Sequence, residues 1–272
     1  MTYLSLIRIN PLRAESRKLL SNPRAAHGAV LGGLPGPQDA ERVLWRLDAD
    51  NPHRPHLLVL TRSRPDWSHL VERAGWPEAD GEHAMVRDYM PLIQRLANGA
   101  EFAFRLTASP VQNTTAPERP TPLQAARIAD TPEGKRRGFR IGHRTAAAQL
   151  DWFLSRTERW GFDVPASRAD PAAPGLDAPQ PVPAAGDTPR EQRLWERNPA
   201  REVRITARQR HSFKKNAGKD ARPVVFHTAT FEGRLRITDA AKFTARLLGG
   251  IGPSKAYGCG LLTLAPVPDR KD

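Results

Sequence analysis

Residues 245–266 read ARLLGGIGPSKAYGCGLLTLAP, with five glycines between Gly249 and Gly260. An ordered glycine costs backbone entropy, so this density indicates that the backbone itself has a task. The glycines follow a predicted helix over 239–250 and lead into a predicted strand over 260–267. Dinucleotide-binding loops and P-loops have the opposite order, strand before helix, and the P-loop pattern G-x-x-x-x-G-K-[ST] is missing. Both kinds of nucleotide site are therefore disfavoured.

Two uses remain open for such a helix-to-strand loop. Its exposed N–H groups could approach a phosphodiester backbone, with charge from Lys255 and stacking or hydrogen bonding from Tyr257. Alternatively, the glycines serve only a tight turn that requires positive φ angles. Under the first use, the candidate RNA-binding residues of this loop are Gly250, Gly252, Lys255, Tyr257, Gly258 and Gly260.

Composition favours a polyanionic partner. The chain has 272 residues, and its 42 Lys and Arg against 29 Asp and Glu give a net charge of +13. A folded protein this basic most often binds nucleic acid or an anionic membrane surface. The single cysteine, Cys259, allows no disulfide within the chain, and MTYLSLIRIN does not read as a signal peptide. No window approaches a membrane span, so we expect a cytoplasmic protein with no membrane partner.

The first half predicts the order β-α-β-β-α-β, which is the ferredoxin-like arrangement. Its strands alternate apolar and polar residues, and its helices begin at Asn22-Pro23 and at Asp66, which are good capping sequences. The predicted elements are a strand over 2–10, a helix over 22–33, a hairpin of strands over 42–50 and 56–63, a helix over 66–75 and a closing strand over 100–112.

The second half predicts the same order more loosely, so we expect an α+β protein of two tandem ferredoxin-like domains. Its elements are a short strand over 138–142, a helix over 145–161, strands over 202–213 and 224–238, the helix over 239–250 and the strand over 260–267. The predicted domains are 1–112 and 135–272, joined by a Thr- and Pro-rich linker over 113–134. Residues 164–200 are rich in Pro and Ala without periodicity, which predicts a mobile surface insertion in the second domain.

Four stretches of the chain together resemble a known family. GGIGPSKAYGCGLLTLAP resembles the glycine-rich signature of the repeat-associated RNA-binding superfamily of CRISPR systems. YLSLIRINPLRAESRKLLSNPRAAHGAVLGG, VLWRLD and FEGRLRITD narrow the resemblance to the CasE-type CRISPR RNA endoribonucleases, the processing subunits of type I-E Cascade. It covers nearly the whole chain except 164–200. It implies two ferredoxin-like domains and cleavage of precursor CRISPR RNA beside a repeat hairpin, without metal or cofactor. It also implies retention on the product with other Cascade subunits.

The resemblance implies a catalytic role for His27. A lone histidine on a helix is usually structural or exposed, but the family's catalytic histidine lies at this position, within a run that this chain carries as Asn22, Pro23 and His27. Histidine suits proton transfer, either removing the proton of a ribose 2′-OH or protonating the 5′-oxygen leaving group. The products would be a 2′,3′-cyclic phosphate and a 5′-OH. Some relatives carry a tyrosine where this chain has Arg24. Residues at i and i+3 are neighbours on a helix, so we expect Arg24 to stabilise the scissile phosphate. We also expect His27 and the glycine-rich loop to converge on one strand of RNA.

A predicted hairpin supplies the other candidate contacts. Residues 201–222 hold eight Lys or Arg and two acids, and KKNAGKD reads as the hairpin tip. Such a run is often only a solvated surface, but in the family the comparable hairpin lies against the repeat stem-loop. A-form RNA is read mainly by shape and phosphate contacts. The candidates are Arg210, Lys214, Lys215 and Lys219. Residues 135–144 form a second basic cluster.

The sequence predicts no metal site, because His53 and His56 have no matching acids or cysteines. Cys259 and the tryptophans at 67, 76, 152 and 160 are expected to pack in the core or at a domain interface. Two alternatives to the enzyme stay open. One is a CRISPR RNA scaffold subunit of the same fold that has lost activity, and the other is a general basic nucleic-acid-binding protein.

Overall fold

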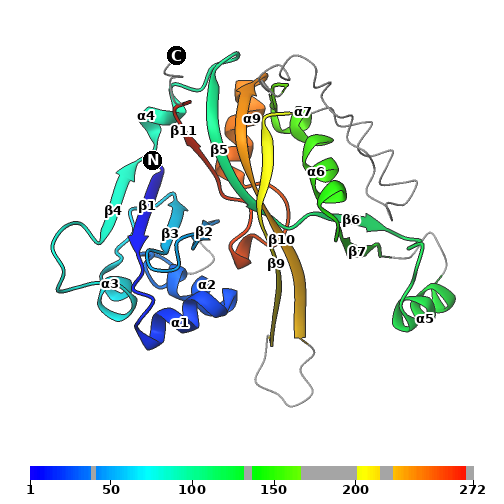
Figure 1. Ribbon diagram of the computed structural model, residues 1–272, viewed down its shortest axis with the longest axis horizontal. Helices are drawn as coiled ribbons and strands as arrows, with labels where there is room; N and C mark the ends of the chain where they lie inside the picture. The colour runs from blue at the N-terminus through cyan, green and yellow to red at the C-terminus, as the bar shows by residue number, and fades with distance from the viewer. Residues whose placement is uncertain (38–40, 132–136, 167–200, 215–222, 268–272) are drawn as a thin grey trace, which may run out of the picture.

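The computed structural model describes residues 1–37, 41–131, 137–166, 201–214 and 223–267. Within these ranges the strands form two larger antiparallel sheets and one two-stranded ribbon (Figure 1). The first half contains β1 (Tyr3–Arg8), α1 (Ala14–Ser21), α2 (Pro23–Leu31), β2 (Leu44–Asp48), β3 (His56–Thr61), α3 (Ser68–Ala74), β4 (Ala84–Asp88) and α4 (Met90–Ile93).

The first sheet has the order β2-β3-β1-β4, and α1, α2 and α3 lie together on one side of it (Figure 1). The prediction that residues 100–112 close this sheet was wrong, because β4 takes that place beside β1. β4 is a five-residue edge strand with no fully buried side chain, so it shows little apolar alternation in the sequence. Helix α1 was also missed.

The second half begins with β5 (Glu101–Ala108), which lies within residues 100–112, the strand predicted for the first half. It also contains β6 (Val111–Thr114), α5 (Pro122–Asp130), β7 (Phe139–Gly142), α6 (Ala146–Leu154), α7 (Thr157–Trp160), β8 (Phe162–Asp163), β9 (Val203–Lys214), β10 (Pro223–Ile237), α9 (Ala240–Gly249), the short 3₁₀ helix η2 (Lys255–Tyr257) and β11 (Leu262–Ala265). Its sheet runs β11-β5-β10-β8, and β9 also pairs with β10.

These pairings give the second half its own β-α-β-β-α-β order, with β5, not residues 138–142, as the first strand. The strand over 138–142 exists as β7, but it pairs with β6 in the separate ribbon. Together the two larger sheets confirm the predicted fold class, two ferredoxin-like units in tandem. Because the first sheet ends at Asp88 and β5 belongs to the second, we propose a domain boundary between 88 and 101 in place of 112.

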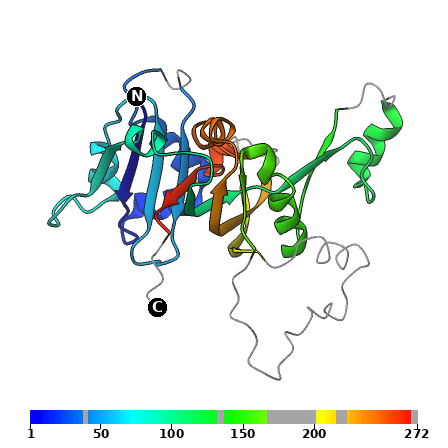
Figure 2. The same cartoon turned by 90° about the horizontal axis from the view of Figure 1, so that it is seen from above.

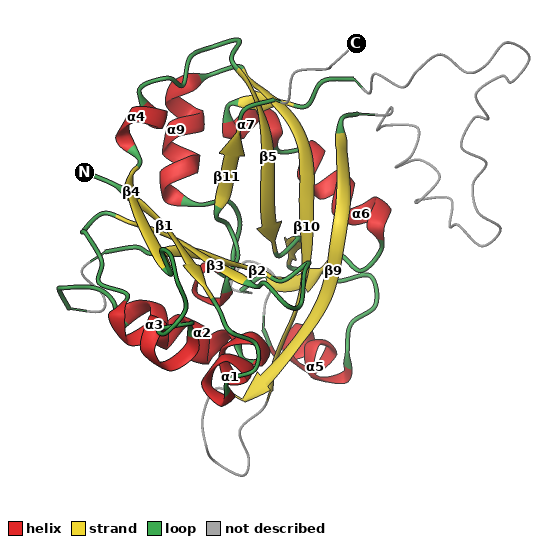
Figure 3. Ribbon diagram, turned by 60° about the vertical axis from the view of Figure 1, so that its left-hand side comes forward, coloured by secondary structure: helices red, strands yellow, loops and turns green. Residues whose placement is uncertain are grey.

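β8 and β9 lie end to end along the same edge of β10 and act as one interrupted strand. Figure 3 shows β9 beside β10. An isolated antiparallel bridge joins Ala166 to Arg201, and the Glu202 N–H donates to the Pro165 carbonyl at 2.9 Å. The Pro- and Ala-rich insertion therefore leaves and re-enters the sheet at one point. Residues 167–200 lie outside the described part of the chain, so their predicted mobility stays a prediction.

Residues 113–134, predicted as a linker between the halves, do not connect the two sheets. They contain the end of β6 and all of α5, which begins at a capping box formed by Thr121 and Gln124. The ribbon of β6 and β7 carries α5 away from the rest of the molecule (Figures 1 and 2). This excursion lies within the second half, between β5 and α6.

The two faces of the first sheet face different cores. Leu57, Val59 and Trp45 pack with residues of α2 and α3, while Leu44 and Leu60 belong to the core of the second half. Successive side chains of a strand point to opposite faces, so the sheet joins both cores. Cys259 and three of the four tryptophans are buried as expected, at positions 67, 152 and 160; Trp76 is half-buried.

Candidate active site and nucleic-acid interface

Helix α2 positions the candidate catalytic histidine. The Asn22 side chain caps it by accepting the Arg24 backbone N–H at 3.0 Å, and Pro23 occupies its first turn. Ala26 and Val30 are buried on the side of α2 that packs against the first sheet. His27 lies between these buried positions and solvent, and it is half-buried.

The two ring nitrogens of His27 lie in different surroundings. Nδ1 is buried and has no hydrogen-bond partner among the described residues, so Nε2 is the candidate nitrogen for proton transfer. Burial lowers the pKa of His27 below its ordinary value of 6.5, because the charged form loses hydration. The free imidazole is therefore mainly neutral at physiological pH and can accept a proton at Nε2.

Arg24 is exposed one turn before His27 on the same helix. The i, i+3 spacing makes the two side chains neighbours on the helix surface, as the sequence predicted. Its contact with a phosphate stays a prediction.

The glycine-rich loop meets this helix. Within it, η2 contacts both α2 and β2, although η2 lies near the end of the chain and α2 near its beginning. The glycine-rich loop and α2 therefore converge, and Figure 1 shows this loop beside the first half of the molecule. This juxtaposition was the main spatial expectation from the sequence.

The loop glycines adopt the backbone angles of a tight turn. Gly250, Gly252, Gly258 and Gly260 have φ angles between 77° and 93°, whereas Gly249 is helical. At Gly258 a Cβ atom would also lie 2.9 Å from the Trp45 ring, so β2 and the loop could not pack as they do. The turn alone is thus a sufficient reason for these glycines.

Two of the candidate glycines already donate their N–H groups inside the protein. Gly250 donates to the Arg246 carbonyl at 2.8 Å, and Gly260 donates to the Thr107 carbonyl at 2.8 Å. Both glycines are buried, as is Gly258, while Gly252 is half-buried. Direct contact of RNA with the four glycines stays a prediction, and the structure favours the tight-turn use.

Lys255 and Tyr257 are also engaged within the fold. The Lys255 ammonium donates to the Gly249 carbonyl at 2.5 Å, at the C-terminal end of α9. Burial lowers the pKa of Lys255, and the nearby cations Arg42 and Arg246 lower it further. These three cations form a positive patch beside the loop. The Tyr257 ring packs on Phe226 with 5.6 Å between centroids.

The hairpin of β9 and β10 carries basic side chains on the face opposite α2. Arg208 and Arg210 are exposed, and together with Arg144 they lower the pKa of His227, which burial lowers first. Arg208 also donates to the Arg144 carbonyl. The basic runs over 135–144 and 201–222 therefore meet in space, which the sequence did not predict. Lys215 and Lys219 lie outside the described residues, and of Lys214 only the backbone is described.

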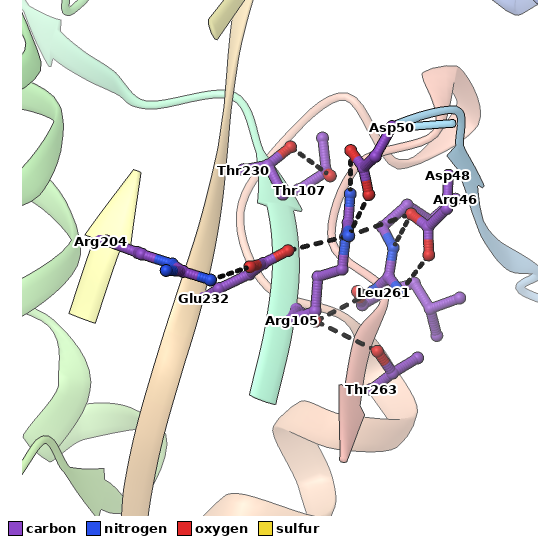
Figure 4. Close-up of polar contacts among 10 residues, drawn as sticks. All are labelled: Arg46, Asp48, Asp50, Arg105, Thr107, Arg204, Thr230, Glu232, Leu261 and Thr263. Carbon is purple, nitrogen blue, oxygen red and sulfur yellow. Dashed lines mark hydrogen bonds and ion pairs between the residues drawn. The ribbon is translucent and has the colours of Figure 1, made fainter. Parts of the chain in front are cut away.

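A buried arginine joins the two halves, and sequence reasoning missed it. Arg46 of β2 is 2 % exposed and donates to the Arg105 carbonyl at 2.9 Å and to the Leu261 carbonyl at 3.1 Å (Figure 4). Its guanidinium also forms a two-pronged pair with Asp48 at 2.7 and 2.8 Å. The available signal was a cation between Trp45 and Leu47 in an apolar strand.

Arg105 continues this network across the junction. It pairs with Asp48 at 3.4 Å, Asp50 at 2.5 Å and Glu232 at 2.8 Å, which come from both halves of the chain (Figure 4). Asp50 is held ionised, because its hydrogen bond from Arg105 lowers the carboxyl pKa. The network fixes β2 against β5 and β10.

The described ranges contain neither a metal-binding cluster nor a membrane-spanning helix. No three His, Cys, Asp or Glu side chains there are grouped so that they could hold a metal ion. Of the helices in the same ranges, none has the length and apolar character needed to cross a bilayer. Burial raises the pKa of the Cys259 thiol to about 12, so this cysteine is a packing residue.

Comparison with known proteins gives a consistent result. Residues 2–266 match the family model described as CRISPR associated protein. The CRISPR-associated endoribonuclease Cse3 of Thermus thermophilus is 28 % identical over 267 residues, covering 97 % of this chain and 100 % of the relative. The Cascade subunit CasE of Escherichia coli K12 is 46 % identical over 48 residues, which are 18 % of this chain and 24 % of that protein. The structure of Thermus thermophilus Cse3 with an RNA representing a pre-cleavage complex has a TM-score of 0.61 and 26 % identity, covering 97 % and 99 % of the two chains.

Proposed function

Because the chain belongs to the CRISPR-associated protein family, we propose that it is an endoribonuclease that cuts precursor CRISPR RNA beside the repeat hairpin. We further propose that it stays on its product as a Cascade subunit in the cytoplasm. One observation carries the enzymatic assignment: α2, with a half-buried neutral histidine, packs against the glycine-rich loop and its cationic patch.

The reaction is a transesterification within the RNA. The ribose 2′-OH attacks the adjacent phosphorus as its proton passes to His27. The bond from phosphorus to the 5′-oxygen breaks, and that oxygen takes a proton from water. The substrate supplies its own nucleophile, so the protein mainly has to hold the phosphate in line. Arg24 is the candidate for stabilising charge on the phosphorane. The products are a 2′,3′-cyclic phosphate and a 5′-OH, and no step needs a metal ion.

In this proposal the stem of the RNA repeat lies along the basic face of the protein hairpin formed by β9 and β10. Arg144, Arg208 and Arg210 supply phosphate contacts there, and Lys214, Lys215 and Lys219 are candidates to extend them. Duplex RNA has a narrow major groove, so recognition by phosphate spacing and helix shape suits a row of cations on a strand.

The test is cleavage of a cognate repeat transcript by the pure protein in EDTA. We expect a cut beside the hairpin with a 2′,3′-cyclic phosphate end. The variant His27→Ala should keep the affinity for the repeat and lose cleavage. An intact transcript at saturating parent protein would count against an enzyme.

A catalytically inactive scaffold subunit is the second candidate, and the observation that favours it is Arg24, which stands where some relatives carry a tyrosine. Parent protein that binds the repeat but never cuts it would establish this candidate. A general nucleic-acid-binding protein would instead show little preference for the repeat over duplex DNA at fixed salt.

A further inference from the structure

A cleft of about 410 Å³ lies between the two halves of the molecule, and we call it the intersheet cleft. Leu20 and Pro23 from α1 and α2, and Trp45 from β2, line it from the first half. The second half contributes residues of β9, β10 and η2. A volume of this size is at the lower end for small-molecule sites.

The cleft is lined in part by the helix and the loop that form the candidate active site. Pro23 is the first residue of α2, which carries His27 one turn later, and Gly258 follows η2 in the glycine-rich loop. A group seated in the cleft would therefore lie next to the proposed cleavage site.

Two rings that line the cleft are held in place by neighbouring aromatic rings. His211 of β9 stacks on Phe226 with 4.7 Å between centroids and an angle of 17°. Tyr257 packs on the same phenylalanine and meets Phe213 edge-on at 5.0 Å. Aromatic rings that are already ordered can stack on a planar group at little further entropic cost.

Polar atoms surround these rings. Thr107 and Thr230 share a hydrogen bond of 2.9 Å, and the Asp50–Arg105 pair lies near them (Figure 4). All four residues line the cleft, as does the exposed side chain of Gln209. Carboxylate, hydroxyl and amide groups together can both donate to and accept from the edge of a planar polar group.

Charge argues against a phosphate in this cleft. Arg105 is already paired with Asp48, Asp50 and Glu232, so its guanidinium is occupied within the protein. The alternation along β9 places Ala207, Gln209 and His211 toward the cleft and puts the arginines at 208 and 210 on the other face. The cleft thus favours a neutral, flat, polar-edged group, which describes a nucleobase.

We propose that the intersheet cleft receives one unpaired nucleobase of the RNA, next to the cut. The proposal rests on the proposed function, and it adds a base-recognition subsite to a protein that otherwise reads phosphates and shape.

The test is an abasic scan. The cut is first mapped, and the repeat hairpin is then made with single-stranded flanks and a 2′-deoxyribose at the cut, so that the RNA binds but is not cleaved. Each flanking nucleotide is replaced in turn by an abasic one, and Kd is measured at fixed salt. We expect one position to weaken binding by about 10-fold or more, as loss of base stacking typically does, and its neighbours to change little.

Two variants connect that position to the cleft. Ala207→Phe should fill the cleft and weaken binding of the intact RNA by about the same factor as the abasic nucleotide. The two changes combined should cost no more than one alone, because they remove the same contact. Gln209→Ala should show partial coupling, and Ser212→Ala, an exposed residue that does not line the cleft, should leave the profile as in the parent.

If no abasic position changes the Kd of the parent protein, the proposal is wrong whatever the variants show. Fully additive losses in Ala207→Phe would also overturn it, including the case in which the cleft seats a segment of a partner protein. Failure of the proposed function is distinguishable, since the parent would then neither prefer nor cut the repeat hairpin.

Discussion

The titration of His27 follows from the burial of its ring. Because burial lowers its pKa below 6.5, the free protein keeps the neutral form to lower pH than an exposed histidine would. If neutral His27 takes the 2′-OH proton, cleavage falls as the pH drops through the lowered pKa. We expect the acidic limb of kcat/KM, measured from about pH 5 to pH 8, to be centred below 6.5.

A matched control for this profile is His53→Asn, because His53 is exposed and belongs to a connecting turn. It should leave the acidic limb where the parent has it. An acidic limb centred above 6.5 would contradict the assignment of His27 as the base in the free protein. The sequence placed His27 within a helix, but the burial of Nδ1 depends on packing that the sequence does not show.

At the scale of elements, the glycine-rich loop offers a comparison within one stretch of chain. Gly258→Ala should destabilise the fold by about 1–2 kcal/mol or more, since left-handed backbone is costly for alanine and its Cβ would meet Trp45. Gly249→Ala should be neutral or stabilising, because Gly249 is helical and has open space around it. Urea denaturation measures both. Equal effects would show that the turn geometry is not what requires glycine.

The strand β9 makes a separate prediction about RNA. Arg210→Gln should weaken binding of the repeat hairpin and lower the slope of log Kd against log salt by about one, as loss of one phosphate contact does. Arg73→Gln changes an exposed arginine of α3 and should leave the slope unchanged. An unchanged slope in Arg210→Gln would remove this face of the hairpin from the RNA interface.

At the scale of the molecule, the sequence predicted the fold class and the meeting of α2 with the glycine-rich loop, but not every pairing partner. Residues 100–112 form a strand wherever they pair, so local alternation could not assign β5 to one sheet. The strand that does close the first sheet is β4, and it shows too little apolar alternation to be recognised in the sequence. The meeting of the two basic runs depends on that same pairing, since β5 leads through the ribbon to Arg144.

The junction between the halves rests on one buried cation. Arg46→Ala would leave Asp48 without its two-pronged partner and two carbonyls, on Arg105 and Leu261, without a donor. Removing one partner of a buried pair typically costs about 3–5 kcal/mol. We expect a loss of that size in urea denaturation. Because β2 also contacts η2 of the glycine-rich loop, we expect the rate of cleavage to fall more than the affinity for the RNA repeat hairpin.

Arg87 provides the matched exposed pair. Its bridge to Glu82 at 3.1 Å is mostly solvated, with side-chain exposures of 69 % and 59 %. Arg87→Ala should therefore change the free energy of unfolding by only about 0–1 kcal/mol and leave cleavage intact. If Arg46→Ala costs no more than Arg87→Ala, the network in Figure 4 does not hold the halves together, and the shared apolar core around Leu44 and Leu60 is sufficient to align α2 with the glycine-rich loop.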